Sequence, residues 1–534
     1  MDEQSQTVGV ATKPAGGARH DLLLMFVLMA VVGLLHLWVL THTTVAARDS
    51  IAFIRYAWQL EHYPWPEVLR GNLHHPGFPV AIAAVSWALR SCGGSLDADT
   101  MRLAAQLANS LAAVLLVVPL YFLGKIVFER RTAFWGVLIY QCLPSSNQLL
   151  SDGLSEGVFL LWAASAILAA VIAHQRSSVL GFALAGVFSG LAYLTRPEGI
   201  LIAPAMALVL LLGQLLPSSR RPWRSTLAES AALLGALTVV AAPYIATIGA
   251  LTNKTTGREI LHTARDVPSQ ATAARQPPLA LVWSVWTDAY RVGQRSGSVP
   301  WAFRGFTVEL LKGFNYVALP AVIFGLWHFR RRWGEPESWL LGAPCLAQAL
   351  AVLRVASVMG YVSERHVQLI VMTGCLWAAA GLLALPGWWQ ERGWRLPRWS
   401  AATWATILPG LVVAVGLPSA LKPLHANRQG HREVGRWLAE HARPTEHIVD
   451  PFCWAEYYAG RAFGPPGPPR PPKEPPDAYY IVLETTSNPH ERLPMIPGAR
   501  ALAERATLIH LWQPATPRKD RPGVAVYFLP AGQL

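Results

Sequence analysis

The sequence predicts an all-α polytopic membrane protein that carries a small extracytoplasmic α/β lobe at its C-terminal end. Of its 534 residues, 52% are hydrophobic and only 14% are charged, whereas roughly a quarter of the residues are charged in an ordinary soluble domain. The apolar residues also gather in blocks of about 17 to 25, the length that crosses a bilayer as a helix. The 22 Trp residues fit side chains anchored at the two membrane interfaces.

The excess of basic residues has a topological explanation. The chain carries a formal net charge of +13, which in a soluble protein would suggest a nucleic-acid partner. Here Lys and Arg lie between apolar blocks, as they do in the cytoplasmic loops of membrane proteins, so we expect no nucleic acid to bind. The first apolar block has no small-residue cleavage site after it. We therefore expect it to remain as a membrane anchor behind a cytoplasmic tail of residues 1–20.

About eleven transmembrane helices are expected within a domain of residues 21–420. With the N-terminus inside, each short inner loop contains Arg or Lys, and the short outer loops hold only Arg196 and Arg365. One span more or fewer would reverse this charge pattern downstream, so the pattern supports the count. The expected spans are 21–40, 102–124, 132–149, 156–173, 178–194, 199–216, 227–249, 314–329, 339–358, 367–386 and 402–420.

Three longer segments are expected on the outer side, at residues 41–101, 250–313 and 421–534. Residues 80–89 are apolar but too few to cross a bilayer, so residues 75–100 are predicted to hold an interfacial or re-entrant helix. The last segment is long enough for a small lobe. It is predicted to contain an exposed Pro-rich loop at 464–476, a helix at 431–441 and strands at 448–449, 480–483, 508–511 and 524–528.

The polar residues that most need an explanation all fall on the predicted outer side. Ionisable groups at helix ends near a bilayer are costly unless they are paired or have a function. Acidic and basic side chains on one face can bind an anionic headgroup and carry out a proton transfer. The candidate residues are Asp49, Tyr56, His74, His75, Asp152, Glu156, Arg196, Glu198, Glu364, Arg365 and His366.

The candidates also have purely structural interpretations. Asp49 would serve as the N-cap of a surface helix. Asp152 and Glu156 fit the first turn of a helix, where the helix dipole favours carboxylates. Arg196 and Arg365 would be interfacial anchors, and the two histidines would be ordinary interfacial side chains. The common location of the candidates, rather than any one of them, favours a functional site.

These motifs resemble those of the GT-C glycosyltransferases, and in particular the bacterial relatives of protein O-mannosyltransferases and lipid A aminoarabinose transferases. The resemblance covers roughly residues 20–390, and its most specific parts are Thr195-Arg196-Pro197-Glu198-Gly199 and Glu364-Arg365-His366. It implies an inverting glycosyltransferase that moves a sugar from a polyprenyl phosphate donor to an acceptor hydroxyl. The reaction is expected on the extracytoplasmic face of the cell (plasma or inner) membrane, with a glycan, a lipid or a protein as acceptor.

The resemblance also implies roles for the candidate residues. Asp49 is similar in position to the general base that deprotonates the acceptor. Arg365, and after it Arg196, would bind the donor phosphate, because a guanidinium grips a phosphate through two parallel hydrogen bonds. No cofactor is required. A divalent metal held by His74, His75 and His262 is conceivable, but their spacing does not support it. The remaining candidates, Tyr56, His74, His75, Asp152, Glu156, Glu198, Glu364 and His366, would line the substrate site.

The sequence departs from the family pattern in its first outer segment. Asp49-Ser50 stands where many relatives have an Asp-Glu pair, and His75-Pro76-Gly77 stands where a Pro-Pro turn is usual. His74 replaces an acid of the aminoarabinose branch, so the substrate of that branch does not carry over.

Two other classes of protein would share this composition. A transporter or lipid flippase would show internal repeats and charges inside its spans, yet no repeat is evident and Arg354 is the clearest charge within a span. A non-catalytic scaffold would use the C-terminal lobe to bind a partner. The five cysteines show no metal-site spacing, but Cys92 and Cys453 both fall in outer segments and are candidates for a disulfide.

Overall fold

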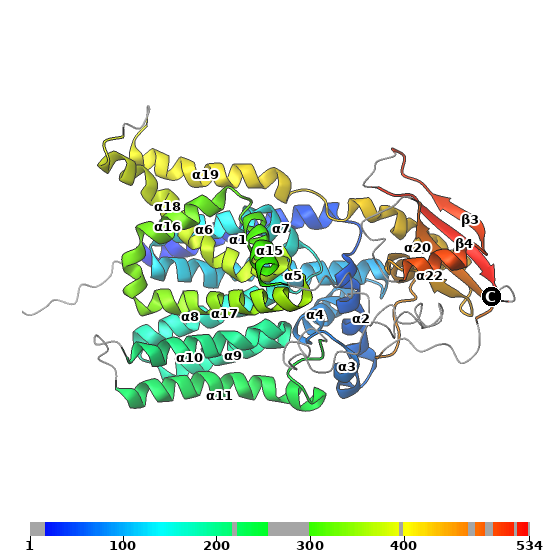
Figure 1. Cartoon of the computed structure of the whole chain (residues 1–534), viewed down its shortest axis with the longest axis horizontal. Helices are drawn as coiled ribbons and strands as arrows, with labels where there is room; N and C mark the ends of the chain where they lie inside the picture. The colour runs from blue at the N-terminus through cyan, green and yellow to red at the C-terminus, as the bar shows by residue number, and fades with distance from the viewer. Residues whose placement is uncertain are drawn as a thin grey trace, which may run out of the picture.

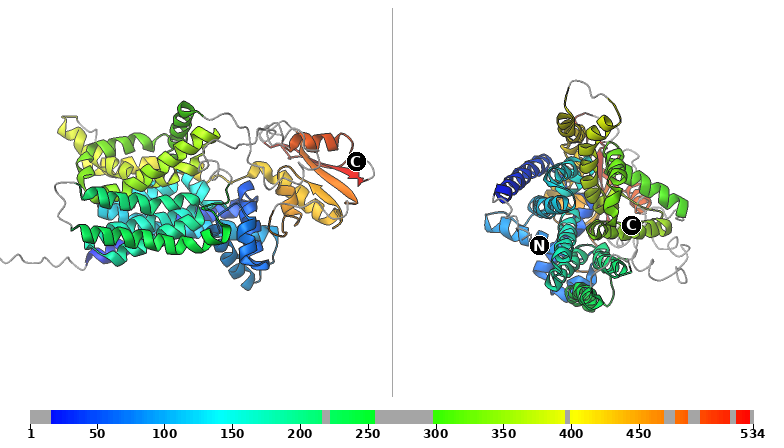
Figure 2. Two further views of the ribbon diagram at one scale, coloured as in Figure 1. Left: turned by 60° about the horizontal axis from the view of Figure 1, so that its bottom comes forward. Right: turned by 90° about the vertical axis from the view of Figure 1, so that its left-hand side faces the viewer.

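The computed structural model is a bundle of long helices with a small sheet at one end, and short helices lie between the two (Figure 1). Figure 2 shows the arrangement from two further directions, with the bundle helices nearly end-on in its right-hand view. The structure describes residues 16–215, 222–254, 298–394, 399–467, 476–485, 495–516 and 521–531. The predicted fold class, an all-α membrane bundle with a small C-terminal α/β lobe, is therefore confirmed.

A helix is present in each of the expected spans. Large apolar side chains of α1, such as Phe26 and Leu34, are exposed, as expected for a surface that contacts lipid. The bundle elements are α1 (Gly16–His42), α5 (Ala98–Val127), α6 (Arg130–Cys142), α7 (Pro144–Ser151), α8 (Glu156–Arg176), α9 (Val179–Thr195), η1 (Pro197–Leu201), α10 (Ile202–Gly213), α11 (Trp223–Ile248), α15 (Val299–Gly313), α16 (Ala318–His328), η3 (Arg330–Gly334), α17 (Pro336–Met359), η4 (Glu364–Val367), α18 (Gln368–Glu391) and α19 (Ala401–Ala420).

One of the expected spans is broken, and another begins at a sharp bend. The span expected at 132–149 divides into α6 and α7, because Leu143 precedes Pro144 and is extended (φ −64°, ψ 132°). The span expected at 314–329 follows a bend of 101° between α15 and α16. Among the described residues, seven helices are long and apolar enough to cross a membrane, or eight if this bent pair is one span. The count of about eleven stays a prediction.

The first outer segment is mostly helical. It contains α2 (Arg48–His62), α3 (Trp65–Gly71) and α4 (Gly77–Ser91), which lie between the bundle and the sheet in Figure 1. The helix predicted within 75–100 is therefore present as α4, with the large side chain of Trp87 exposed. Cys92 follows this helix as an exposed free thiol, and Cys453 is buried and free, so the candidate disulfide does not form.

The C-terminal lobe is a four-stranded sheet with the order β1-β2-β4-β3. The parallel pair is β1 with β2, and β4 is antiparallel to both β2 and β3. Val434 and Leu438 of α20 are buried against Val482 and Val526 of the sheet. The predicted helix and strands are all present. The lobe elements are η5 (Ala426–Arg428), α20 (Gln429–His441), β1 (His447–Val449), α21 (Trp454–Tyr458), β2 (Ala478–Glu484), α22 (Ile496–Ala503), β3 (Thr507–Trp512) and β4 (Val524–Pro530).

Parts of two predicted loops lie outside the described residues. These are the middle of the 250–313 segment, which includes His262, and most of the Pro-rich loop at 464–476. The beginning of the Pro-rich loop is described and rests on α2, where Gln59 Nε2 donates to the carbonyl oxygens of Gly464 (2.9 Å) and Pro465 (3.0 Å).

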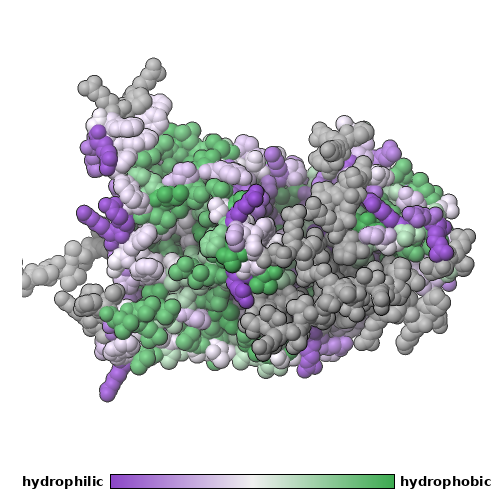
Figure 3. Space-filling model, viewed as in Figure 1, coloured by the Kyte–Doolittle hydropathy of each residue, from purple (hydrophilic) through white to green (hydrophobic). Residues whose placement is uncertain are grey.

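The two ends of the bundle differ in charge. At the end away from the lobe, Asp21 of α1 accepts hydrogen bonds from Tyr121 (2.9 Å) and Arg130 (2.6 Å) and pairs with Lys125. Figure 3 shows a largely green bundle surface with purple residues at this end. Most of the described inner-loop arginines lie at helix termini of the same end, among them Arg176 at the end of α8 and Arg392 just after α18.

The orientation of these ends is testable by cysteine labelling in intact cells. Thr445, in the lobe, and Gln175, at the basic end of α8, are both exposed. We expect Thr445→Cys to react with a membrane-impermeant maleimide and Gln175→Cys to be shielded, because basic loops face the cytoplasm. Both variants need a Cys92→Ser background, since Cys92 is itself exposed. The reverse labelling pattern would overturn the orientation.

Candidate functional site

One buried carboxylate joins two arginines at the lobe-facing end of the bundle. Glu156 is the first residue of α8, and its side chain is 1% exposed. Its Oε1 accepts one hydrogen bond from Nη1 of Arg196 and one from Nε of Arg365, each at 2.5 Å. Arg196 follows the last residue of α9, and Arg365 lies in η4 just before α18. Three helix ends therefore meet at one carboxylate.

The Thr-Arg-Pro-Glu-Gly turn explains the position of Arg196. The residue before a proline is driven out of the helical region, and Arg196 is extended (φ −146°, ψ 139°), so α9 ends there. The chain then folds back closely on α9. A Cβ atom at Gly199 would lie 2.3 Å from the carbonyl carbon of Ala192 and from the nitrogen of Tyr193. Only glycine permits this close approach of the chain to α9. The resulting turn holds Arg196 in the position from which its side chain reaches α8.

Asp49 joins the same cluster from α2. Its Oδ2 forms an ion pair with Nη1 of Arg365, and its side chain remains 28% exposed. Asp49 lies in the first turn of α2, whereas the N-cap residue is Ala47 and forms no side-chain cap. The N-cap interpretation of Asp49 is therefore wrong. Arg365 lies between an accessible carboxylate, Asp49, and a buried one, Glu156.

Glu198 and Lys254 extend the cluster. Nη2 of Arg196 donates to Oε1 of Glu198 at 3.0 Å. Lys254, six residues after the end of α11, is half-buried near these groups. Burial lowers the pKa of Lys254 to about 8, and the nearby charges of Arg196 and Arg365 add to this effect while Glu198 opposes it. The cluster thus contains as many described cations as carboxylates, counting Asp49, Glu156, Glu198, Arg196, Arg365 and Lys254.

Lys254 was missed by the sequence analysis. Lys254 belongs to no recognisable motif. It lies in a long polar segment, where a single lysine gives no signal of function. The sequence feature that could have identified Lys254 is its position just after an apolar span, on the side where the other candidate residues are predicted. The segment is held in place by Asn253, whose Nδ2 donates to the carbonyl oxygens of Leu69 and Asn72, each at 3.0 Å.

Several buried polar atoms in this region have no hydrogen-bond partner in the described part of the chain. They are Oε2 of Glu156, Oε2 of Glu198 and Nδ1 of His74. Native proteins rarely leave buried polar atoms unpaired, and those that remain call for a water, an ion or a ligand. The cluster therefore has capacity to bind a polar group.

The two adjacent histidines have different surroundings. Nδ1 of His75 lies 2.7 Å from the carbonyl oxygen of Tyr193, and Nε2 lies 3.1 Å from Oγ1 of Thr252. Burial lowers the pKa of His75 to about 3, so the neutral ring donates from Nδ1 and accepts at Nε2. His75 thus clamps α9 to the segment after α11, and neither nitrogen is left for a substrate. The ring of His74 packs against Phe53 in a tilted arrangement with ring centres 4.4 Å apart, and burial lowers the pKa of His74.

The other predicted site residues support the cluster or lie apart from it. Nδ1 of His366 accepts from the backbone N–H of Ser363 at 3.2 Å and stabilises the turn that carries Arg365. The carbonyl of Glu364 accepts from Gln368 at 3.2 Å in the same turn. Tyr56 of α2 is buried in apolar contact with Leu60 and Val68, and its hydroxyl has no hydrogen-bond partner in the described part of the chain.

Asp152 links the site to the C-terminal lobe. Its Oδ1 accepts from the backbone N–H of Gly153 (2.8 Å), and its Oδ2 lies 2.7 Å from Nε2 of His425. His425 belongs to the connection between α19 and α20. Burial opposes the charged form of His425, but the attraction and hydrogen bond of Asp152 outweigh it, so the pKa of His425 is raised.

Metal ligands do not gather in the part of the chain that the structure describes. It contains no group of three or more His, Cys, Asp or Glu residues that is able to hold an ion. His74 and His75 point to different partners, and His262, the third residue of the conceivable metal set, lies outside the described residues. No cofactor is indicated.

Comparisons with known proteins identify the fold. Residues 78–254 match the family described as dolichyl-phosphate-mannose-protein mannosyltransferase. This segment contains Asp152, Glu156, Arg196 and Glu198 and ends at Lys254. In a comparison with curated proteins, none matches significantly.

Solved structures of low sequence identity share the architecture. ArnT from Cupriavidus metallidurans bound to undecaprenyl phosphate has a TM-score of 0.57 at 13% identity, over 96% of this chain and 98% of that one. The apo oligosaccharyltransferase of Archaeoglobus fulgidus has a TM-score of 0.56 at 12% identity, over 83% of this chain. The oligosaccharyltransferase AglB from Archaeoglobus fulgidus, in complex with an inhibitory peptide and a dolichol-phosphate, has a TM-score of 0.52 at 13% identity, over 87% of this chain. The chain covers 64% and 61% of these two archaeal chains. The chain therefore has the GT-C fold that its sequence predicts, and residues 78–254 are similar to the mannosyltransferase family.

The Asp152–His425 pair should make stability depend on pH. Because the folded-state pKa of His425 is raised, its stabilising contribution is fully present below the unfolded value of about 6.5. It is lost as the pH rises through the folded value. We expect His425→Gln to lower the melting temperature of the detergent-solubilised protein most at acidic pH and progressively less above it. His62→Gln, on the exposed face of α2, is the control, and a His425→Gln deficit that is the same at every pH would refute this coupling.

Proposed function

We propose that the chain is an inverting glycosyltransferase that moves a sugar from a polyprenyl phosphate donor to an acceptor hydroxyl at the extracytoplasmic face of the cell membrane. The observation that carries the proposal is the placement of Arg365 between the accessible carboxylate of Asp49 and the buried carboxylate of Glu156. A proton acceptor and a phosphate-binding group are thereby adjacent. The shared fold with ArnT bound to undecaprenyl phosphate supports a lipid-phosphate donor.

Asp49 is the preferred general base because it is the most accessible carboxylate of the cluster. Its side chain is 28% exposed, against 18% for Glu198 and 1% for Glu156. Glu156 and Glu198 are also engaged by Arg196. In the proposed reaction Asp49 takes the proton of the acceptor hydroxyl, and the acceptor oxygen attacks the anomeric carbon. The bond from that carbon to the phosphate oxygen breaks, and the lipid phosphate leaves with the electron pair.

The cations of the cluster are the proposed donor-binding groups. Arg365 binds Glu156 and Asp49 through Nε and Nη1, and each guanidinium has more N–H donors than these contacts use. Lys254 forms no ion pair among the described residues and is partly desolvated, so an anion beside it would be bound strongly. A phosphate held by Arg365, Arg196 and Lys254 would have its developing charge stabilised as the sugar departs.

The main alternative is a transporter or lipid flippase. Transporters bind their substrates near the middle of the membrane, between interrupted helices. Here the ionisable cluster lies at helix termini, namely the start of α8, the end of α9 and the start of α18. A scaffold has no need of a buried ion cluster with unpaired polar atoms. Both alternatives are therefore less favoured than a transferase with its site at the surface of the membrane.

Replacing the proposed base tests the chemistry. Asp49→Asn keeps the size of the side chain but removes the proton acceptor. We expect sugar transfer from a labelled polyprenyl phosphate sugar in membranes to fall at least about 100-fold, with normal expression. Asp97→Asn is the matched control, because Asp97 is an exposed N-cap of α5 and Asn caps equally well. Near-normal transfer by Asp49→Asn protein would remove Asp49 from the mechanism.

Replacing the proposed phosphate-binding groups tests whether they bind the lipid-phosphate donor. Arg365→Ala should weaken competition by undecaprenyl phosphate, with a loss of about 2 to 4 kcal/mol if the contact is desolvated. Arg365→Lys should restore only part of it, since an ammonium lacks the paired hydrogen bonds. Lys254→Gln should also weaken competition. Arg354→Ala, at an exposed position of α17, is the control. Unchanged competition in the Arg365 and Lys254 variants would return Arg365 to a structural role.

A further inference from the structure

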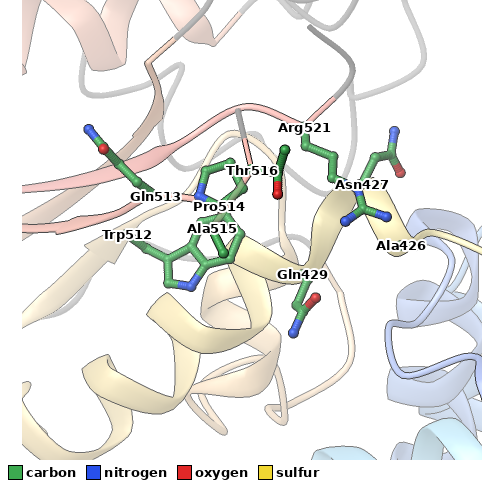
Figure 4. Close-up of a pocket in the computed structure, with 9 residues that line it drawn as sticks. All are labelled: Ala426, Asn427, Gln429, Trp512, Gln513, Pro514, Ala515, Thr516 and Arg521. Carbon is green, nitrogen blue, oxygen red and sulfur yellow. The ribbon is translucent and has the colours of Figure 1, made fainter. Parts of the chain in front are cut away.

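A polar pocket lies in the C-terminal lobe, and none of its described lining residues belongs to the ion cluster. It has a volume of about 380 Å³ and lies between the turn after α19 and the ends of β3 and β4. This volume is at the lower end of the range for small-molecule sites, roughly 300 to 1,000 Å³. Figure 4 shows the guanidinium of Arg521 near Asn427, Thr516 between Arg521 and Pro514, and the Trp512 indole beside Pro514 and Ala515.

The chemistry of the lining is specific. Its polar side chains are the amides of Asn427, Gln429 and Gln513, the hydroxyl of Thr516 and the guanidinium of Arg521. Amides and hydroxyls both donate and accept hydrogen bonds, as the hydroxyls of a saccharide do. None of the described lining residues is acidic. Arg521 forms no ion pair within the described ranges, and it is the one charged side chain among the described lining residues.

The aromatic wall of the pocket is held in place. Trp512 is half-buried, and its ring lies against the first turn of α20, where a Cβ atom at position 430 would lie 2.5 Å from Cε3 of Trp512. Gly430 therefore allows the indole to lie in this position. A fixed aromatic ring can cover the apolar face of a sugar ring at little cost in side-chain entropy.

The pocket is connected to the proposed reaction site through the chain. The turn that contributes Asn427 and Gln429 begins just after His425, whose Nε2 lies 2.7 Å from Asp152. Asp152 in turn precedes Glu156 by four residues. The pocket thus begins one residue after the contact that joins the lobe to the bundle beside the proposed reaction site.

We propose that this pocket binds an acidic saccharide unit of the acceptor. The amides and Thr516 bind sugar hydroxyls, the Trp512 ring packs on a sugar face, and Arg521 binds the carboxylate or phosphate through paired hydrogen bonds. The assignment of the saccharide to the acceptor rests on the proposed function. The binding of an acidic saccharide does not, and it is measurable without turnover.

The test uses the full chain in detergent with two matched probes, digalacturonate and its neutral dimethyl ester. Saturation-transfer NMR or calorimetry measures their affinity. We expect digalacturonate to bind, and Trp512→Ala and Arg521→Gln each to weaken it at least fivefold. Arg521→Gln should leave the weaker binding of the ester unchanged, because only the acid contacts the guanidinium. Trp394→Ala, at an exposed tryptophan of the opposite bundle end, is the control, and Trp512→Phe tests the ring with less change in packing.

The outcomes separate this inference from the proposed function. Digalacturonate should bind equally well to Asp49→Asn protein and should not be displaced by undecaprenyl phosphate. Displacement by the lipid phosphate would assign the anion site to the donor and overturn the inference. Absent binding, or equal binding by wild type, Trp512→Ala and Arg521→Gln, would also overturn it. Loss of transfer in Asp49→Asn protein with intact probe binding supports both proposals independently.

Discussion

The buried carboxylate of Glu156 is the interaction on which the site depends. It is 1% exposed and accepts from two arginines that come from different helix ends. Removing one partner of a buried ion pair leaves an uncompensated charge, which typically costs about 3 to 5 kcal/mol. The start of α8, the end of α9 and the turn before α18 are therefore coupled. Asp49 adds α2 to this group through Arg365, so four segments meet in one geometry.

Apolar packing alone would leave these helix ends free to move relative to one another. In a bilayer, helices associate through close contacts of small residues, with little hydrophobic driving force. At the α16–α18 contact, a Cβ atom at Gly325 would lie 2.1 Å from the carbonyl oxygen of Trp377. Such contacts bring the helices together, while the ion cluster determines the position of their ends. The lobe is joined by the Asp152–His425 pair and by Arg432 and Arg436, which both bind Asp99.

The sequence predicted what depends on local patterns and missed what depends on packing. Apolar blocks were enough for the helices of the bundle, and the residue pattern after position 420 was enough for the helix and strands of the lobe. The ion pairs were not predictable, since Asp49 and Arg365 are 316 residues apart in sequence. Hydropathy also does not report bends, so the break at residue 143 was not predicted although Pro144 signals it. The role of His75 depends on a backbone carbonyl, that of Tyr193, which no sequence pattern identifies.

Under the proposed function, the position of Arg365 couples the two charge changes of the reaction. Before transfer, Arg365 is paired with Asp49 and Glu156, and the donor phosphodiester carries one negative charge. When Asp49 takes the acceptor proton, it loses its charge, and the departing lipid phosphate gains one. Arg365 then has one carboxylate partner fewer at the moment when the phosphate needs more stabilisation, and no net charge is created in a partly desolvated site. Glu156 does not change in this exchange, because burial and two arginines hold it, and it keeps the guanidinium in place while its second partner changes from a carboxylate to a phosphate.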